Sequence, residues 1–358
     1  MKPFVTEILI ILSGLFCIHC SSLLDEKALL PPATGESGEI VLVMDSAKWV
    51  GPLGDEVRNT FRAPFPGLLQ DEPVFNLVYV DPAKLNSVLR NSRNMVFVNT
   101  LEGASRGDII LRNYFTRESL EKIQSDTSIF MSKQDDLFAR GQAVMHLFQN
   151  TGDRLARHIR TNRSSIQQYF VNVEKKRFQR SLYKAPREGG IESILWQNHQ
   201  CFMQIPYGYE IALETGNSIW IRSMDNKVDK NLFITYKDYT EEQAFNRDNI
   251  VSFRDRTWRK FLLGNDSLSY MITEPLVPVD STSMNWKNKF TVEARGVWKL
   301  YNNSMGGPFL GYTFVDEALG RLYYIEGFVY APGQKKRNTL RELETILWTF
   351  ETQSEHSS

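Results

Sequence analysis

Five short apolar runs, separated by helical or turn-rich stretches, constrain the fold of the first half of this chain most strongly. They cover residues 39–45, 75–80, 94–99, 128–131 and 143–148. Continuous apolar runs of this length are typical of strands buried on both faces of a parallel sheet. Amphipathic segments at 49–61 and 82–89 separate the first three runs. The alternation therefore predicts an α/β domain over residues 38–185.

A long helical pattern follows, from Gly152 to about Tyr183, with an expected break near Thr161. One face of this helix carries arginine at every third position, at Arg154, Arg157, Arg160 and Arg163. Such a stripe indicates either a solvated helix face or a surface for anionic lipid or a polyanion. The solvated face is favoured, because no aromatic residues alternate with the arginines as they would on a base-stacking surface.

A Pro/Gly-rich stretch at residues 185–190 marks a domain boundary, and the pattern changes after it. Alternating apolar and polar residues predict several strands in the second half. The expected strands lie at residues 202–205, 218–222, 232–236, 290–300, 311–315 and 322–330. One helix is expected within 241–262, and an amphipathic helix at 337–350 closes the chain. Residues 191–352 are therefore expected to form an α+β sandwich, an antiparallel sheet covered by helices.

The N-terminus indicates export. Residues 1–19 are predicted to be a signal peptide, because an apolar run at 8–18 is too short for a membrane span of about 20 residues. Cys20 follows directly and is the expected lipidation site, with residues 20–37 as a lipidated tether. Cleavage after Ser22 and an uncleaved anchor are the alternatives. A lipid at Cys20 would hold the protein at a membrane without a spanning helix.

Charge and composition limit the chemistry. The chain has 42 Lys and Arg against 42 Asp and Glu, so it lacks the basic excess of a nucleic-acid binder. Its five histidines show no metal-ligand spacing, and no nucleotide or nucleophile motif is present, so neither a metal nor a cofactor is expected. Cys201 lies in apolar sequence and is expected to be a buried, inert thiol rather than one partner of a dyad with His199.

The most promising binding surface lies on the predicted strands of the second half. Its candidate residues for a ligand or partner are Arg295, Trp298, Gly306, Gly307, Tyr312, Tyr324 and Glu326, with Tyr330 beside them. Aromatic rings, an Arg–Glu pair and two glycines could form a groove. The alternative is a tight hairpin with core aromatics and a cross-strand pair between Arg295 and Glu326. A second candidate, Asp45 with Lys48 and Trp49, follows the first strand, where a helix cap is the alternative.

Several segments resemble domain-of-unknown-function family 4837, envelope lipoproteins of Bacteroidota. They are TGESGEIVLVMD at 34–45, IPYGY at 205–209, EARGVW at 293–298, MGGPF at 305–309 and EGFVYAP at 326–332. Together they extend over nearly the whole chain after the signal. The resemblance implies an exported, membrane-tethered protein and supplies no catalytic residues. The element order of the second half is also similar to the Mog1/PsbP-like fold.

The sequence therefore favours a non-catalytic envelope lipoprotein, at the outer membrane and facing the periplasm or the surface. It would bind an envelope protein or glycan that the sequence does not identify, and no nucleic acid. The alternative is a hydrolase acting on envelope glycan or peptide, with Asp45 and Glu326 as its carboxylates. A tethered spacer without a ligand is a third possibility. The oligomeric state does not follow from the sequence.

Overall fold

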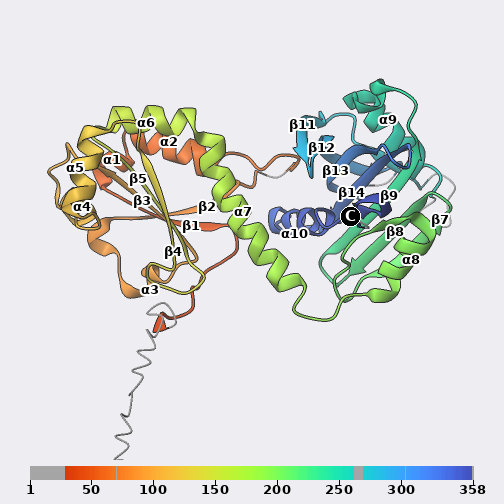
Figure 1. Ribbon diagram of the computed structural model, residues 1–358, viewed down its shortest axis with the longest axis horizontal. Helices are drawn as coiled ribbons and strands as arrows, with labels where there is room; N and C mark the ends of the chain where they lie inside the picture. The colour runs from red at the N-terminus through yellow and green to blue at the C-terminus, as the bar shows by residue number, and fades with distance from the viewer. Residues whose placement is uncertain (1–28, 70, 262–268, 303, 357–358) are drawn as a thin grey trace, which may run out of the picture.

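The computed structural model describes residues 29–69, 71–261, 269–302 and 304–356. The expected signal peptide and Cys20 lie outside the described residues. Within the described part of the chain, no helix combines the length and apolar character that crossing a bilayer requires. Figure 1 shows two domains side by side, each built on its own sheet, with one long helix running from the first toward the second.

The sheet of the first domain has five strands in the described part of the chain, in the order β2-β1-β3-β5-β4. The strands are β1 (Glu39–Met44), β2 (Asn76–Val80), β3 (Asn94–Thr100), β4 (Met131–Asp135) and β5 (Ala143–Gln149). All pairings are parallel except that of the edge strand β4. The predicted α/β class is confirmed. Strand β4 begins later than expected, because Asp126 accepts hydrogen bonds from the backbone and hydroxyl of Ser128 and forms a turn there.

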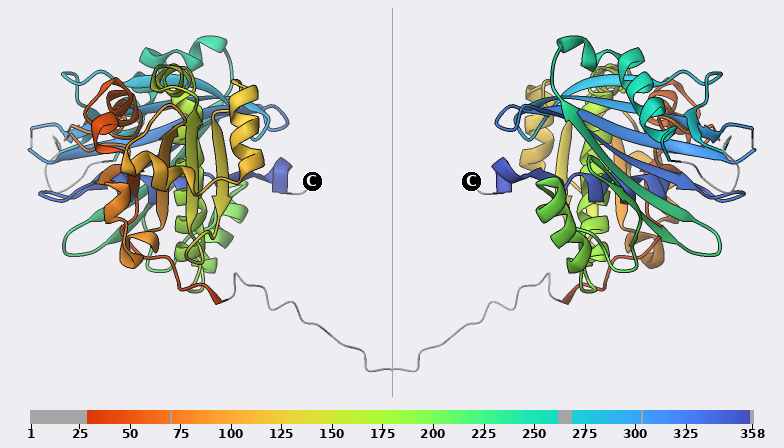
Figure 2. Two further views of the ribbon diagram at one scale, coloured as in Figure 1. Left: turned by 90° about the vertical axis from the view of Figure 1, so that its left-hand side faces the viewer. Right: turned by 90° about the vertical axis from the view of Figure 1, so that its right-hand side faces the viewer.

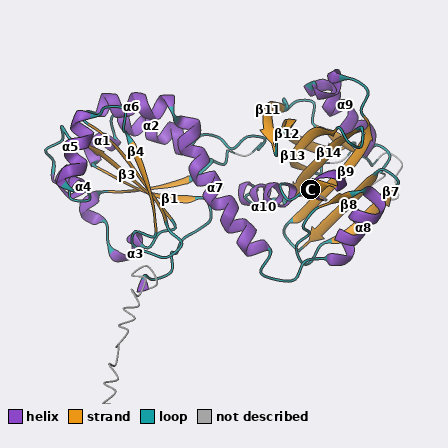
Figure 3. Ribbon diagram, in the orientation of Figure 1, coloured by secondary structure: helices purple, strands orange, loops and turns teal. Residues whose placement is uncertain are grey.

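Helices cover both faces of this sheet (Figure 3). On one face lie α2 (Pro52–Phe61), α6 (Gly152–Thr161) and α7 (Arg163–Leu182), packed on Leu42, Val96 and Met145. On the other face α4 (Arg106–Arg112) packs on Val43 and Phe97. Shorter helical elements are α1 (Ser46–Trp49), η2 (Pro82–Lys84), α3 (Ser87–Arg90) and α5 (Arg117–Ser125). The break expected near Thr161 is confirmed by the end of α6.

The second domain contains an antiparallel sheet of eight strands among the described residues. Its order is β10-β12-β13-β14-β9-β8-β7, with β11 paired to β12 beside β10. The strands are β7 (Glu210–Thr215), β8 (Ser218–Met224), β9 (Asp229–Asp238), β10 (Met271–Thr273), β11 (Asp280–Trp286), β12 (Lys289–Leu300), β13 (Gly306–Asp316) and β14 (Arg321–Tyr330). The long strands curl, as the right-hand view of Figure 2 shows. The expected α+β class is confirmed.

Two helices, α8 (Gly189–His199) and α10 (Arg337–Leu347), cover one face of this sheet, and α9 (Arg247–Trp258) covers the other. The remaining elements are β6 (Cys201–Phe202), η3 (Glu242–Phe245), β15 (Glu351–Thr352) and α11 (Gln353–His356). Helix α8 was not predicted from the sequence. Its buried face contains Glu192 and His199 beside Ile191 and Leu195, so polar residues interrupt the apolar stripe.

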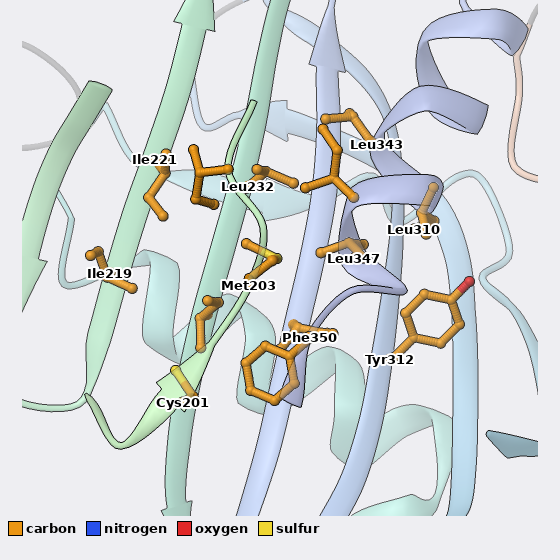
Figure 4. Close-up of a cluster of buried hydrophobic side chains, with 14 of the residues drawn as sticks. Cys201, Met203, Ile219, Ile221, Leu232, Leu310, Tyr312, Leu343, Leu347 and Phe350 are labelled. Atoms are coloured by element: carbon orange, nitrogen blue, oxygen red, sulfur yellow. The ribbon is translucent and has the colours of Figure 1, made fainter. Parts of the chain in front are cut away.

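Cys201 lies in the core on the sheet face that α8 and α10 cover, in one cluster with Met203, Ile219 and Phe350 (Figure 4). Burial raises the pKa of this thiol to about 12. The expectation of a buried thiol is confirmed. His199 ends α8, where its Nδ1 lies 3.4 Å from the hydroxyl of Tyr236. A thiol with so high a pKa does not supply a nucleophilic thiolate.

The two domains touch along α10. Glu72 of the first domain accepts hydrogen bonds from the backbone amides of Lys336 and Arg337, at 2.7 and 3.2 Å. It therefore caps the start of α10 from a distant part of the sequence. In return, the Arg337 guanidinium donates to the Pro73 carbonyl at 2.8 Å, and that of Arg341 donates to the Val74 carbonyl at 2.6 Å. Helix α7 packs beside α10 at the same contact.

Candidate functional site

A groove lies at the end of the second sheet where β12 turns back into β13. We call it the hairpin groove. It consists of two adjoining hollows of about 440 and 230 Å³, and Trp298 and Met305 line both. The first hollow is also lined by Leu68, Leu69, Glu274, Val297, Lys299, Gly306, Gly307, Pro308 and Lys336. The second is also lined by Trp220, Arg222, Met224, Asp229, Asn231, Met271, Leu300, Phe328 and Tyr330.

The walls of the hairpin groove are mainly apolar. Leu69 and Met224, one in each hollow, are 66% and 54% exposed. Exposed apolar side chains gathered in one place mark interaction surfaces more often than isolated ones do. Glu274 and Lys299 form an ion pair at 3.1 Å on the rim. Hydrogen bonds from the Leu276 amide and the Lys299 ammonium lower the pKa of Glu274, so this carboxylate is charged at neutral pH.

The floor of the groove is fixed by Trp298. Its indole Nε1 donates a hydrogen bond to the Val329 carbonyl at 3.2 Å, and its ring meets Phe328 edge-on with centroids 5.6 Å apart. Gly307 lies opposite Trp298 in the β12–β13 register. A Cβ at Gly307 would clash with the Val329 carbonyl oxygen. The absence of a side chain at Gly307 therefore allows the backbone of β13 to lie close to the Val329 carbonyl of β14. The glycine serves the packing of the chain at this point and not the approach of a ligand.

The structure divides the predicted binding residues between the two faces of the sheet. Trp298, Tyr324 and Glu326 face α9, whereas Arg295 and Tyr312 face α10, because successive residues of a strand point to opposite faces. Arg295 pairs with Leu310, one row away from Gly311, which pairs with Glu326. The expected cross-strand pair of Arg295 and Glu326 is therefore wrong. Of the seven candidates, Trp298, Gly306 and Gly307 line the hairpin groove.

Glu326 is instead bound by Arg254 of α9, a residue that was not among the sequence candidates. The guanidinium donates from Nε to Oε2 at 2.7 Å and from Nη2 to Oε1 at 2.8 Å, and the Tyr324 hydroxyl donates to Oε2 at 2.6 Å. Both charged side chains are fully buried. Burial is the largest effect and disfavours the charged guanidinium, but Glu326, Tyr324 and Asp255 together outweigh it and raise the pKa of Arg254. The sequence does carry one indication of this pair, because Arg254 occupies a position on the buried face of α9.

Arg295 belongs to a second network on the opposite face. It donates to Glu293 at 2.7 and 3.0 Å and forms an ion pair with Glu344 of α10 at 3.2 Å. The Tyr312 hydroxyl donates to Glu293 at 3.0 Å. Lys175 of α7, in the first domain, places its ammonium 2.8 Å from the centroid of the Trp348 ring, which lies beside this network. The network therefore belongs to the contact between the domains.

The second sequence candidate is a structural cap. Asp45 accepts hydrogen bonds from the backbone amides of Ala47 and Lys48 at 3.0 and 3.4 Å, and from the Ser105 hydroxyl at 2.7 Å. A Cβ at Gly107 would come within 2.9 Å of its carboxylate, so the space beside it is filled. Lys48 is paired with Asp108. The helix-cap interpretation is confirmed for Asp45.

Trp49, the third member of that candidate, stacks on Tyr79 with centroids 4.8 Å apart. Asp45 follows a strand of the first sheet, whereas Glu326 lies inside the second sheet and is fully buried. The two carboxylates named for the hydrolase alternative therefore do not share a site. Among residues 29–356, outside the gaps in the description, no cluster of three or more metal-ligating side chains is found.

The arginine stripe of α6 and α7 has two parts. Arg160 and Arg163 both bind Glu56 of α2, with nitrogen–oxygen distances of 2.7 and 3.1 Å. The hydrogen bond from Arg160 lowers the pKa of Glu56. Arg154 and Arg157 are exposed and line a shallow hollow together with His158 and Thr161. Arg160 and Arg163 therefore have a structural role, because their ion pairs with Glu56 hold α2 against α6 and α7.

The strand order of the two sheets and the placement of their helices define a two-domain protein, in which an α/β domain is followed by an α+β domain. Residues 190–349 match the family model described as "Domain of unknown function (DUF4837)", which confirms the resemblance seen in the sequence. Residues 33–183 match a separate model, "Domain of unknown function (DUF8532)". The first half thus matches a model of its own, where the sequence patterns had predicted one family across both halves. No curated protein matches the sequence.

Solved structures give weak likenesses that cover less than half of the chain. A variant of the protein Mog1 matches 43% of this chain and 90% of its own, with 6% identity and a TM-score of 0.28. The Ran-binding protein Mog1p of Saccharomyces cerevisiae matches 45% and 94%, with 8% identity and a TM-score of 0.30. Human STARD10 matches 46% and 75%, with 9% identity and a TM-score of 0.22.

Proposed function

We propose that this is a non-catalytic binding protein of the cell envelope, held at a membrane by lipid on Cys20. Its hairpin groove receives an extended apolar segment of a partner protein. The observation that carries the proposal is the pair of adjoining hollows that share Trp298 and Met305. Two hollows in a row accommodate successive side chains of an extended segment, with Trp298 between them.

The chemistry of the walls favours an apolar protein segment over a sugar. Leu68, Leu69 and Pro308 line one hollow, and Met224, Met271 and Leu300 line the other. Flexible methionines adapt to varied apolar side chains and are frequent on protein-binding surfaces. A buried sugar would need free polar groups on the walls to pair with its hydroxyl groups. Here Asn231 accepts a hydrogen bond from the Trp220 indole at 3.0 Å, so its carbonyl oxygen already has a partner.

The rim of the hairpin groove carries both signs of charge. Glu274 and Lys299 pair with each other, and the second hollow is lined by Arg222 and Asp229. Arg222 also forms an ion pair with Glu210 at 2.9 Å. Mutually neutralised rim charges contribute little net attraction, so the affinity of the groove would come from its apolar centre. This supports a partner segment with apolar anchors and polar flanks.

Selection of a random peptide library on the full chain, followed by affinity measurement, tests the groove. The selected peptides should be enriched in apolar residues. Leu69→Glu and Met224→Glu should each weaken their binding at least about ten-fold, because each places a charge where an apolar anchor is buried. Val88→Glu is the control, since Val88 is also a largely exposed apolar residue, at 73%, but lies on α3. Peptides that are no more apolar than the library, or that bind both groove variants normally, would refute the proposal.

The tether is tested separately, by mass spectrometry of the mature N-terminus and by membrane fractionation. We expect a lipid-modified Cys20 at the N-terminus and loss of membrane association in Cys20→Ala. Unchanged association of that variant would exclude the anchor without bearing on the groove.

A further inference from the structure

A second groove lies at the opposite end of β13 from the hairpin groove. We call it the turn groove, because three turn segments build it. They are the β11–β12 turn at Lys287–Asn288, the β13–β14 turn at 317–320, and the segment from Tyr239 to Phe245 after β9. Its volume is about 990 Å³, larger than either hollow of the hairpin groove. The backbone amide of Tyr239 donates to the Gly320 carbonyl at 2.9 Å and joins two of the turns.

Three aromatic rings line the turn groove in succession. Tyr239 and Phe245 have centroids 6.1 Å apart with planes at 58°, and Phe245 and Phe290 have centroids 5.0 Å apart with planes at 81°. Phe290 is 58% exposed. It follows a two-residue turn in which Lys287 and Asn288 both have positive φ, of 51° and 64°. That turn type fixes the strand register and therefore the position of the Phe290 ring.

The charge of the turn groove is negative. Glu242, Asp316 and Glu317 line it against a single base, Lys289. Lys289 is already paired with Glu355 at 2.8 Å, and Asp316 accepts hydrogen bonds from the Ser354 hydroxyl at 2.7 Å and the Leu319 amide at 3.0 Å. Glu242 and Glu317 are exposed and form no ion pair with any residue that the structure describes. Two carboxylates of the groove are thus left to attract a cation.

We propose that the turn groove binds an organic cation, an ammonium or guanidinium group, against the faces of Phe245 and Phe290 and opposite the carboxylates of Glu242 and Glu317. Aromatic rings attract cations through the negative charge of their faces. Rings set nearly at right angles offer a cation more than one ring surface. The carboxylates on the same walls attract a positively charged ligand, whereas they give no such attraction to a neutral ligand of equal size. The groove therefore selects charge as well as shape.

Nuclear magnetic resonance titration of the full chain tests this inference with matched probes. Choline and its neutral tert-butyl isostere form one pair, and acetyl-arginine amide and acetyl-citrulline amide form the other. At least one cation should bind and perturb signals of the groove more strongly than its neutral partner. The better of the two cations distinguishes a quaternary headgroup from a basic side chain as the source. If neither cation binds better than its neutral partner, the proposal is wrong.

Variants locate the binding. Phe290→Leu keeps an apolar side chain but removes the ring, and it should weaken cation binding about two- to five-fold. Glu242→Gln with Glu317→Gln should weaken it further and reduce its dependence on salt. Tyr301→Leu is the matched control, because Tyr301 is an exposed ring outside the groove. Unchanged affinity in Phe290→Leu, or equal loss in Tyr301→Leu, would overturn the proposal.

Discussion

Arg254 and Glu326 form a two-point ion pair in the centre of the second domain, with nitrogen–oxygen distances of 2.7 and 2.8 Å and no solvent exposure on either side chain. The pair joins α9 to the middle of β14. Thr273 of β10 also takes part, since its hydroxyl accepts from Arg254 at 3.2 Å. A buried ion pair of this kind ties three elements to one geometry, although its net contribution to the free energy of folding is small.

Removing one partner of this pair should be far more harmful than removing both. Arg254→Met leaves the Glu326 carboxylate buried without a counter-charge and should lower the free energy of unfolding by about 3–5 kcal/mol. Arg254→Met combined with Glu326→Leu should recover most of that loss, but not all, because the Tyr324 hydroxyl loses its acceptor. Urea denaturation of the single variant, the double variant and the parent protein measures this. Equal losses in the single and double variants would contradict it.

Stability should fall in acid because of His146. This residue of β5 is buried and stacks on Phe97 with centroids 4.9 Å apart. Burial lowers its pKa to about 4, whereas an unfolded histidine titrates near about 6.5. The unfolded chain therefore binds the proton first, and stability is lost as the pH falls from about 6.5 to about 4, by up to roughly 3 kcal/mol.

His146→Phe isolates this effect, because it keeps a ring against Phe97 and removes the titrating group. Urea denaturation at about pH 7 and about pH 4.5 should show a smaller acid loss in the variant than in the parent protein. The carboxylates titrate alike in both, so the difference belongs to His146. An equal acid loss in the two proteins would show that His146 is not the cause.

Lys175 should titrate near neutrality. Burial against the Trp348 ring lowers the pKa of this ammonium to about 7, and Glu344 opposes the shift. Nuclear magnetic resonance of methylated lysines should therefore find one midpoint near 7 that disappears in Lys175→Met. Glu344→Gln should lower the midpoint further, because it removes the largest compensating charge. A midpoint near the ordinary lysine value of about 10.4 would mean that the domains leave Lys175 in water.

Gly307→Ala should destabilise the second domain by roughly 1–3 kcal/mol, because the added methyl group meets the Val329 carbonyl. Gly216→Ala is the control, since nothing lies near a Cβ at that position. Thermal and urea unfolding compare the two. If Gly307 served mainly to admit a ligand, the variant would keep its stability and lose only peptide binding.

The patterns of the chain predicted elements whose signal is local. The apolar runs at 39–45 and 143–148, the helix break near Thr161 and the closing amphipathic helix each depend on neighbouring residues. Helix α8 and strands β7, β10 and β11 were not predicted. Strand β10 has only three residues, which is too short for a pattern. Strands β7 and β11 are mostly exposed, so neither of these two strands shows a clear alternation of buried and exposed residues. Their place is set by pairing with distant strands.

The candidate site depended on information that is not local. Whether Arg295 faces Glu326 is decided by the register of β12, β13 and β14, and a shift of one residue moves a side chain to the other face. The sequence motifs identified the correct strands, but they did not show which of the candidate residues lie on the same face of the sheet. Leu68 and Leu69 come from the first domain, far from Trp298 in sequence, so only the folded chain places them together.

The first hollow of the hairpin groove is built by both domains, because Leu68 and Leu69 come from the first domain and Trp298 and Met305 from the second. A segment bound there would contact both domains at once. Its binding free energy would then add to that of domain docking, which links occupancy to interdomain geometry. Saturating ligand would make the two domains melt as one thermodynamic unit, so calorimetry could report occupancy of the groove without any probe placed in it.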